Sequence, residues 1–148
     1  MVYPTDADFA EARSHRAPPQ RDVVADIVDV AAQPLTFDDL RAANLRRLPQ
    51  FKNAKGEPAH SQPDGSDWSD SDWLMAVTGE LGEFANLRKK VLRGDVPMAE
   101  AHTQLAHELA DVVTYLDILA FRMGIDLGAA VREKFNVVSA RVGADVKL

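Results

Sequence analysis

Two pairs of acidic residues have a spacing that suits metal binding. Glu80 and Glu83 stand in the motif E-L-G-E, and Glu108 and Asp111 stand in the motif E-L-A-D. Residues three positions apart lie on the same side of an α-helix, so each motif would present two carboxylates in one direction. Glu80 also follows Val77 by three positions, which places its carboxylate on or beside an apolar face that should be buried.

Four carboxylates that converge between packed helices would repel one another. They cannot all stay ionised in a low-dielectric gap unless a cation is present or their pKa values rise. The chain has no cysteine, and neither helix offers a histidine at ligand spacing, so the oxygen ligands favour Mg²⁺, or Mn²⁺, over zinc. The competing interpretation is that these are ordinary solvated acids.

A di-iron carboxylate centre is the alternative metal site. Such a centre normally needs Glu-x-x-His on two helices. Here that spacing occurs at Glu57 and His60, but the pair spans Pro58 in a predicted loop. The sequence therefore favours Mg²⁺ over iron.

The elements that would position these acids are helices, predicted from apolar spacing, capping residues and glycines. The predicted helices begin at Thr36, at Ser69 or Ser71, at Pro97 and at Asp126, and the last three end at Gly94, Gly124 and Gly143. The 24 residues between Glu83 and Glu108 allow the second and third helices to form an antiparallel hairpin. No stretch shows sustained alternation of apolar and polar residues, so we expect an all-α fold, an antiparallel helical bundle of about four main helices. In the last helix we expect these residues to face inside: Leu127, Ala130, Val131, Phe135 and Val138.

The amino-terminal part has a different composition. Seven of the eight prolines lie in the first 63 residues. Residues 1–21 lack apolar periodicity and are predicted to be a mobile tail, and residues 22–148 a single helical domain. Residues 21–31 could form a short helix, and residues 49–70 a long loop that holds His60 and Trp68.

Composition excludes several classes of function. A chain of 148 residues with a net charge of −6 is poorly suited to broad contact with nucleic acid or anionic lipid. It has no apolar run of the roughly 20 residues that a membrane span needs. Asp6, Asp8 and Glu11 stand where a signal peptide would be basic and then apolar, so we expect a cytoplasmic protein without a membrane or nucleic-acid partner.

Three segments together resemble a known family. They are T-G-E-L-G-E-F-A-N-L-R-K-K, H-E-L-A-D-V-V-T-Y-L-D-I-L-A and G-I-D-L-G-A-A-V-R-E-K-F-N-V-V-S-A-R-V-G, and the match covers about residues 70–143. They resemble the MazG-type all-α nucleoside triphosphate pyrophosphohydrolases of bacteria and phages. The resemblance implies that Glu80, Glu83, Glu108 and Asp111 bind Mg²⁺ and carry catalysis. It also implies a homodimer or homotetramer.

Further residues are candidates for substrate binding. Asn86, Lys90 and Arg93 continue the Glu83 face at helical steps and could meet phosphates. By the resemblance, the ending of the last helix adds Lys134, Asn136 and Arg141. On a regular helix Asn136 points away from the face shared by Lys134 and Arg141, so it could serve a neighbouring subunit's site. The competing interpretation is that each basic residue is simply solvated at the end of a helix.

Aromatic residues could bind the base. The candidates are His60, Trp68, Trp73 and Tyr115. For Trp73, which lies on the apolar stripe, a place in the core is the competing interpretation.

The expected function is Mg²⁺-dependent hydrolysis of (d)NTP to (d)NMP and pyrophosphate, which would trim the nucleotide pool in a bacterial or phage-infected cell. Phosphoribosyl-ATP or an alarmone such as ppGpp are alternative substrates. A non-catalytic module that binds metal and nucleotide is the alternative outside enzymes.

Overall fold

The four main helices predicted from the sequence occur at the predicted places in a computed structural model, which describes residues 34–148. The helices are α3 (Phe37–Arg47), α4 (Asp70–Leu92), α5 (Met98–Arg122) and α6 (Leu127–Val142), and a short 3-10 turn, η1 (Leu48–Gln50), follows α3. Within this described part there are four α-helices and no strand, apart from one isolated bridge between Lys52 and Pro58. The all-α prediction is therefore confirmed. The predicted tail and the helix at 21–31 lie outside the described residues.

The helix starts follow from their capping residues. Thr36 accepts a hydrogen bond from the Asp39 amide at 3.1 Å, and the Asp39 carboxylate accepts one from the Thr36 amide, which completes a capping box. Ser69 and Asp72 form the same arrangement at the start of α4, so Ser69 rather than Ser71 is the cap. Asp126 caps α6 by accepting from the Ala129 amide at 2.9 Å.

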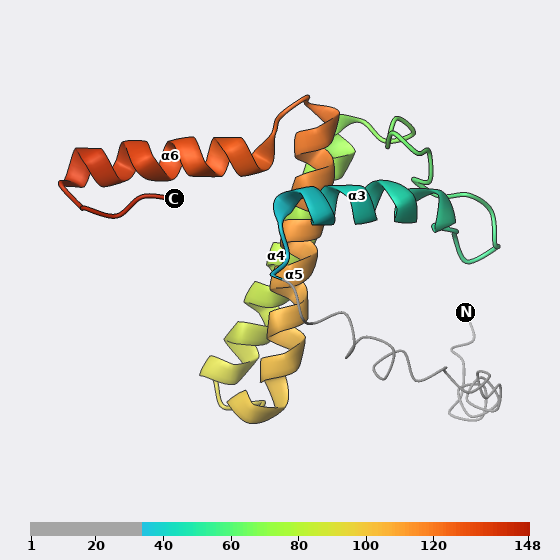
Figure 1. Cartoon of the computed structure of the whole chain (residues 1–148). Coiled ribbons are helices and arrows are strands. Elements are labelled where there is room, and N and C mark those ends of the chain that lie inside the picture. The colour runs from blue at the N-terminus through green and yellow to red at the C-terminus, as the bar shows by residue number, and fades with distance from the viewer. Residues whose placement is uncertain (1–33) are drawn as a thin grey trace. The chain divides into compact units, whose positions relative to one another are not determined.

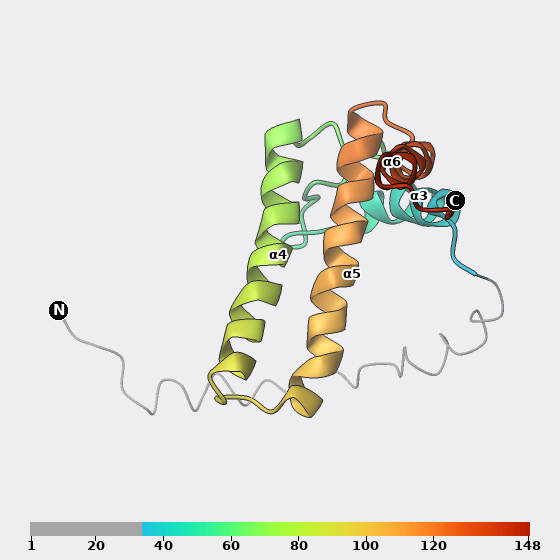
Figure 2. The same cartoon turned by 90° about the vertical axis from the view of Figure 1, so that its left-hand side faces the viewer.

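Helices α4 and α5 run side by side in opposite directions, as Figure 2 shows. The turn between them contains Gly94, whose φ of +79° lies in the left-handed region that glycine adopts without strain. The predicted antiparallel hairpin is confirmed. Helix α3 lies across α5, and the end of α3 leads through η1 into the loop that precedes α4 (Figure 1).

The hydrophobic core lies where this loop, η1 and the ends of the hairpin meet. Leu48, Trp73, Ile118 and Leu119 are its buried members. Leu45, Phe51, Trp68 and Tyr115 pack against them. The core therefore fixes the open end of the hairpin and the loop beside it.

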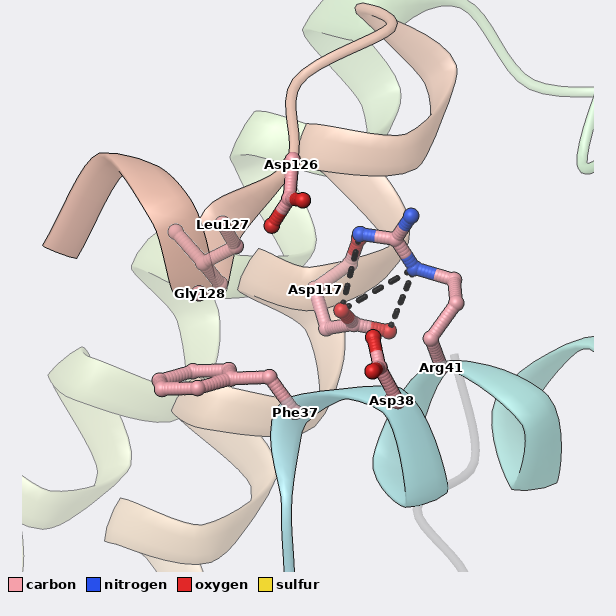
Figure 3. A pocket seen from close by; sticks show the side chains of 7 residues that line it. All are labelled: Phe37, Asp38, Arg41, Asp117, Asp126, Leu127 and Gly128. Carbon is pink, nitrogen blue, oxygen red and sulfur yellow. Dashed lines mark hydrogen bonds and ion pairs between the residues drawn. The ribbon is translucent and has the colours of Figure 1, made fainter. Parts of the chain in front are cut away.

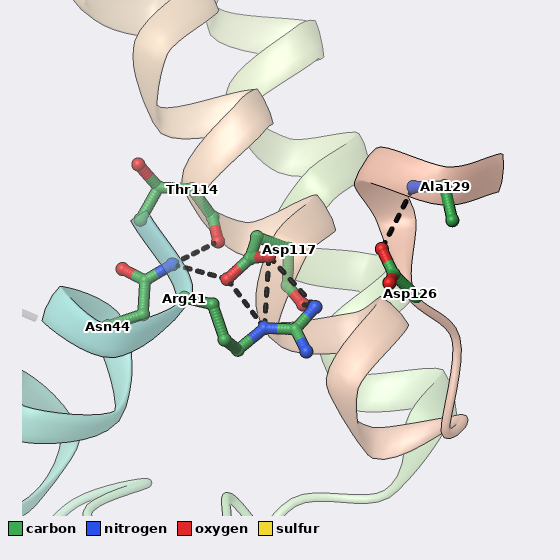
Figure 4. Close-up of polar contacts among 6 residues, drawn as sticks. All are labelled: Arg41, Asn44, Thr114, Asp117, Asp126 and Ala129. Atoms are coloured by element: carbon green, nitrogen blue, oxygen red, sulfur yellow. Dashed lines mark hydrogen bonds and ion pairs between the residues drawn. The ribbon is translucent and has the colours of Figure 1, made fainter. Parts of the chain in front are cut away.

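A buried carboxylate joins α3 to α5. Asp117 has 1 % of its surface exposed and accepts two hydrogen bonds from Arg41 Nε, at 3.0 and 3.1 Å. Asn44 Nδ2 donates to Asp117 at 3.0 Å and to the Thr114 carbonyl at 3.2 Å (Figure 4). Each polar group thus has a partner, as a buried charge requires.

The prediction for the inner face of α6 is partly wrong. Val131 is 38 % exposed and Phe135 is 40 % exposed. The reason is that α6 contacts α3 and α5 near its start, where Gly128 lies against Phe37, and then extends away from the hairpin (Figure 1). Its apolar stripe is covered only in part by the described residues: Leu127, Ala130 and Val138 are half-buried, whereas Val131 and Phe135 are exposed.

None of the described helices is both long enough and apolar enough to cross a membrane.

Candidate metal centre

Three of the four predicted ligands come together on the α4–α5 hairpin. One carboxylate oxygen each from Glu80, Glu83 and Glu108 lies within 4.8 Å of the other two. Glu108 is buried, Glu80 is half-buried and Glu83 is exposed. The cluster therefore has a protein wall on one side and solvent on the other.

The register of the hairpin explains why these residues meet. Glu83 lies 12 residues before Asp95 in the turn, and Glu108 lies 12 residues after Val96. Two positions equally far from the turn stand opposite each other in an antiparallel pair. The i, i+3 spacing then places Glu80 on the same side of α4, one turn before Glu83.

The charges at the site are not compensated. Burial raises the pKa of Glu80 above its ordinary value of 4.5, and the negative charges of Asp111, Glu83 and Glu108 raise it further. No cation contributes to this shift. Repulsion among the carboxylates therefore disfavours the fully ionised state that a bound cation would favour.

Asp111 and Gln104 extend the centre along α5. Asp111 is exposed, and its charge acts on Glu80, so the fourth predicted ligand lies beside the cluster formed by the other three. Gln104 Nε2 donates to Glu108 Oε1 at 3.3 Å. This contact orients the buried carboxylate, and sequence reasoning did not identify Gln104.

The donor set fits Mg²⁺ or Mn²⁺. Mg²⁺ prefers oxygen ligands at about 2.1 Å, which places ligand atoms within about 4 Å of each other. The separations of up to 4.8 Å among the glutamate oxygens are close to that value. A divalent cation would also remove the repulsion at Glu80. The solvent side leaves room for the waters that Mg²⁺ retains.

The predicted phosphate residues on α4 lie along the exposed part of the hairpin. Asn86 and Lys90 are exposed. Arg93 is exposed too and pairs with Asp95 in the turn. An incoming phosphate would therefore compete with Asp95 for Arg93.

The predicted phosphate residues on α6 are not brought to the carboxylates of the same chain. Within residues 34–148, α6 contacts α3 and α5 but not α4. Lys134 and Arg141 are exposed on the projecting part of the helix. Asn136 uses its side-chain amide on the backbone of Leu148, donating at 3.3 Å and accepting at 3.0 Å.

The predicted base-binding residues form one aromatic cluster with Phe51. The His60 ring lies 4.7 Å from Phe51 and 4.5 Å from Trp68 between centroids. Trp73 lies 4.7 Å from Trp68 and 6.2 Å from Tyr115. The residues were predicted to share a pocket, and the structure brings them together.

Their exposure differs, and this limits what each could contact. Trp73 has no exposed surface, and its Nε1–H donates to the Gly65 carbonyl at 3.0 Å. It is a core residue that holds the loop. Trp68, His60 and Tyr115 are half-buried.

Tyr115 connects the aromatic cluster to the carboxylates. Burial raises the pKa of Tyr115, and the charges of Glu80 and Asp111 raise it further, whereas Arg47 lowers it. Arg47 lies at the end of α3, with its guanidinium carbon 5.6 Å from the centre of the Phe51 ring. Arg47 and Phe51 were not among the predicted site residues. The sequence could have indicated Arg47 as a basic residue in the last turn of a predicted helix. It could not show where the Arg47 side chain points, because this depends on how α3 crosses α5.

A hollow lies where α3, α5 and α6 meet, apart from the carboxylate cluster. It has a volume of about 150 Å³ and shares no residue with the carboxylate cluster. Figure 3 shows Asp38, Asp117 and Asp126 around it, with Arg41 paired to Asp117. Two of these acids already have partners, since Asp126 caps α6. Asp117 and Asp126 therefore make structural contacts here, and the hollow is not part of the candidate centre.

Comparison of the chain with protein family models, with curated proteins and with solved structures gives no match in any of the three.

Proposed function

We propose that this protein is a Mg²⁺-dependent nucleoside triphosphate pyrophosphohydrolase that converts (d)NTP to (d)NMP and pyrophosphate. The observation that carries the proposal is the convergence of Glu80, Glu83 and Glu108 within 4.8 Å on two antiparallel helices. The E-L-G-E and E-L-A-D motifs and their resemblance to MazG-type enzymes support it. The activity would trim the nucleotide pool in the cytoplasm of a bacterial or phage-infected cell.

In this proposal the carboxylates hold the metal. Glu80, Glu83 and Glu108 are the ligands, and Asp111 is the fourth. When bound, Mg²⁺ neutralises phosphate charge and activates water. Glu83 is exposed and belongs to the cluster, so its carboxylate is the candidate to accept the proton of the attacking water.

Cations on the protein would meet the remaining phosphate charge. Asn86 and Lys90 are exposed on α4, and Arg93 becomes free for this role if it leaves Asp95. Arg47 adds a cation beside Tyr115. The base would bind at the half-buried part of the aromatic cluster, the part formed by His60, Trp68 and Tyr115.

The proposed enzyme is at least a homodimer. Leu81 is 50 % exposed and Leu109 is 45 % exposed on the hairpin, and Val131 and Phe135 are exposed on α6. In the proposed dimer, a second copy of the chain would cover these exposed apolar side chains. A second copy would also explain how Lys134, Asn136 and Arg141 reach phosphates, because each would serve the neighbouring site.

The test is a panel of the common NTPs and dNTPs with dUTP, each with Mg²⁺, with Mn²⁺ and with EDTA. We expect metal-dependent release of pyrophosphate and monophosphate, which Glu108→Ala abolishes. Glu133→Ala, an exposed glutamate on α6, is the matched control and should retain activity.

Other outcomes would redirect the proposal. Turnover of ppGpp or phosphoribosyl-ATP alone would keep the reaction type and change the substrate. Binding of Mg²⁺–nucleotide without any product would contradict the enzyme and favour a non-catalytic module. Release of inorganic phosphate in place of pyrophosphate would contradict cleavage between the α and β phosphates.

A further inference from the structure

The ring of His60 occupies the middle of the aromatic cluster. Phe51 and Trp68 lie 4.7 and 4.5 Å from it, and Trp73 meets it edge-on at 5.9 Å. These distances are those at which aromatic rings attract one another. A planar heteroaromatic ring therefore already fills the space among these side chains, and it is supplied by the protein itself.

Two features of His60, one in its backbone and one in its ring, are energetically unfavourable. Its φ is +40°, and it is the single non-glycine residue of positive φ among residues 34–148. A side chain in this region of the backbone map is strained. In addition, its Nε2 atom is buried and has no hydrogen-bond partner. A buried polar atom without a partner lowers stability.

The loop on both sides of His60 is fixed by hydrogen bonds, whereas the Nε2 atom of His60 has none. The Ala59 amide donates to the Phe51 carbonyl at 3.2 Å, and the Gly65 carbonyl accepts from Trp73 Nε1 at 3.0 Å. Arg122 Nη1 donates to the Asp64 carbonyl at 3.3 Å. These anchors lie on both sides of His60 in the loop, so the ring could leave while Phe51 and Trp73 stay in place.

We propose that His60 is a placeholder, and that the planar heteroaromatic ring of a nucleotide replaces it between Phe51 and Trp68. This inference rests on the proposed function for the identity of the ligand. Replacement recovers the stacking contacts of His60 and removes its strain and its unpartnered nitrogen from the cluster. The position suits a base because Trp73 links the cluster to Tyr115, which lies beside Glu80 and Asp111.

A pair of substitutions separates a placeholder from a direct base contact. His60→Gly empties the space and suits the positive φ, whereas His60→Phe keeps a ring there without a polar atom. We expect His60→Gly to lower the Kd for nucleosides about fivefold and His60→Phe to raise it about fivefold. If His60 bound the base directly, His60→Gly would weaken binding instead.

The probes are uridine, cytidine, thymidine, adenosine and guanosine in EDTA, followed by the fluorescence of Trp68 and Trp73. Lys55→Gly, in the same loop, and His102→Phe, on α5, are controls at exposed positions and should leave the Kd unchanged. In turnover assays the same His60 variants should move KM in the same directions.

Several results would overturn the inference. These are weaker nucleoside binding by His60→Gly, equal binding by His60→Phe and the wild type, or no nucleoside binding by any variant. Thermal melting shows whether His60→Gly is folded, and His60→Phe carries the test if it is not. Because the nucleoside assay needs neither metal nor phosphate, it can fail while Glu108-dependent hydrolysis stands, and the reverse also holds.

Discussion

Glu80 shows how a single side chain links stability to the proposed chemistry. Its pKa is raised, first by burial and then by Asp111, Glu83 and Glu108. A carboxyl with a raised pKa in the folded state binds protons more tightly there than in the unfolded chain. The contribution of Glu80 to the stability of the metal-free protein should therefore fall as the pH rises from 4.5 through its folded pKa. Comparison of the wild type with Glu80→Gln isolates this contribution from that of His60, whose lowered pKa acts in the opposite direction.

Mg²⁺ should reverse this loss. At about 100 times its dissociation constant, a ligand that binds only the folded state adds about 2.7 kcal/mol to the free energy of unfolding. Glu80→Gln should raise the melting temperature in EDTA at pH 7, because it removes one repelled charge, and should abolish the Mg²⁺ increment. Melting curves from pH 4 to pH 8, with EDTA and with Mg²⁺, measure both effects.

The control is Glu133→Gln, which changes an exposed glutamate outside the cluster. It should leave the Mg²⁺ increment as in the wild type. A Glu80→Gln protein that melts at the wild-type temperature in EDTA and still gains from Mg²⁺ would rule out a shared cation at this cluster.

At the scale of the elements, the sequence predicted what depends on local spacing. Capping residues, glycines and apolar periodicity act within a few positions, so the helices and the opposed acids of the hairpin could be predicted. The Arg41–Asp117 pair could not, because its partners are 76 residues apart and meet only through the crossing of α3 over α5. The path of α6 could not be predicted either, because an apolar stripe indicates that a face is buried but not which chain buries it.

The start of α4 gives a local test. Ser69 accepts from the Asp72 amide at 3.2 Å, whereas Ser71 lies inside the helix. Ser69→Ala should lower the free energy of unfolding by about 1 kcal/mol, because an N-cap acceptor is lost. Ser71→Ala is the matched control and should change stability little. Urea denaturation measures both, and equal effects would contradict the assignment of the cap.

The junction of α3 and α5 gives a larger effect. Asp117 is buried, and Arg41 and Asn44 both donate to it. Asp117→Ala should lower the free energy of unfolding by roughly 3–5 kcal/mol, because Arg41 keeps its charge and loses the carboxylate that pairs with it. Arg41→Met combined with Asp117→Ala should cost less than Asp117→Ala alone. Equal losses in the single and double variants would show that the unpaired charge is not the cause.

At the scale of the whole molecule, a second copy of the chain would account both for the exposed apolar residues and for the position of α6. Val131 and Phe135 are exposed on a stripe that the described part of the chain covers only in part, and Lys134 and Arg141 lie on the same projecting helix. A twofold arrangement would bury the stripe and carry these cations to the other chain's carboxylates. Phe135→Glu should therefore yield a monomer in sedimentation velocity experiments, whereas Arg132→Glu, an exposed neighbour, should not.

Complementation tests whether the second chain contributes to the site or only covers a surface. Glu108→Ala chains lack a metal ligand but have an intact α6, and Lys134→Ala/Arg141→Ala chains have the reverse defect. If each site combines the hairpin of one chain with α6 of the other, a mixed dimer has one intact site. Unfolding and refolding an equal mixture should then restore about a quarter of the wild-type activity, because half of the dimers are mixed and each has one working site of two. Activity no higher than the sum of the two separate variants would mean that α6 serves the interface alone, and that the phosphates are bound by cations of the same chain, such as Lys90 and Arg47.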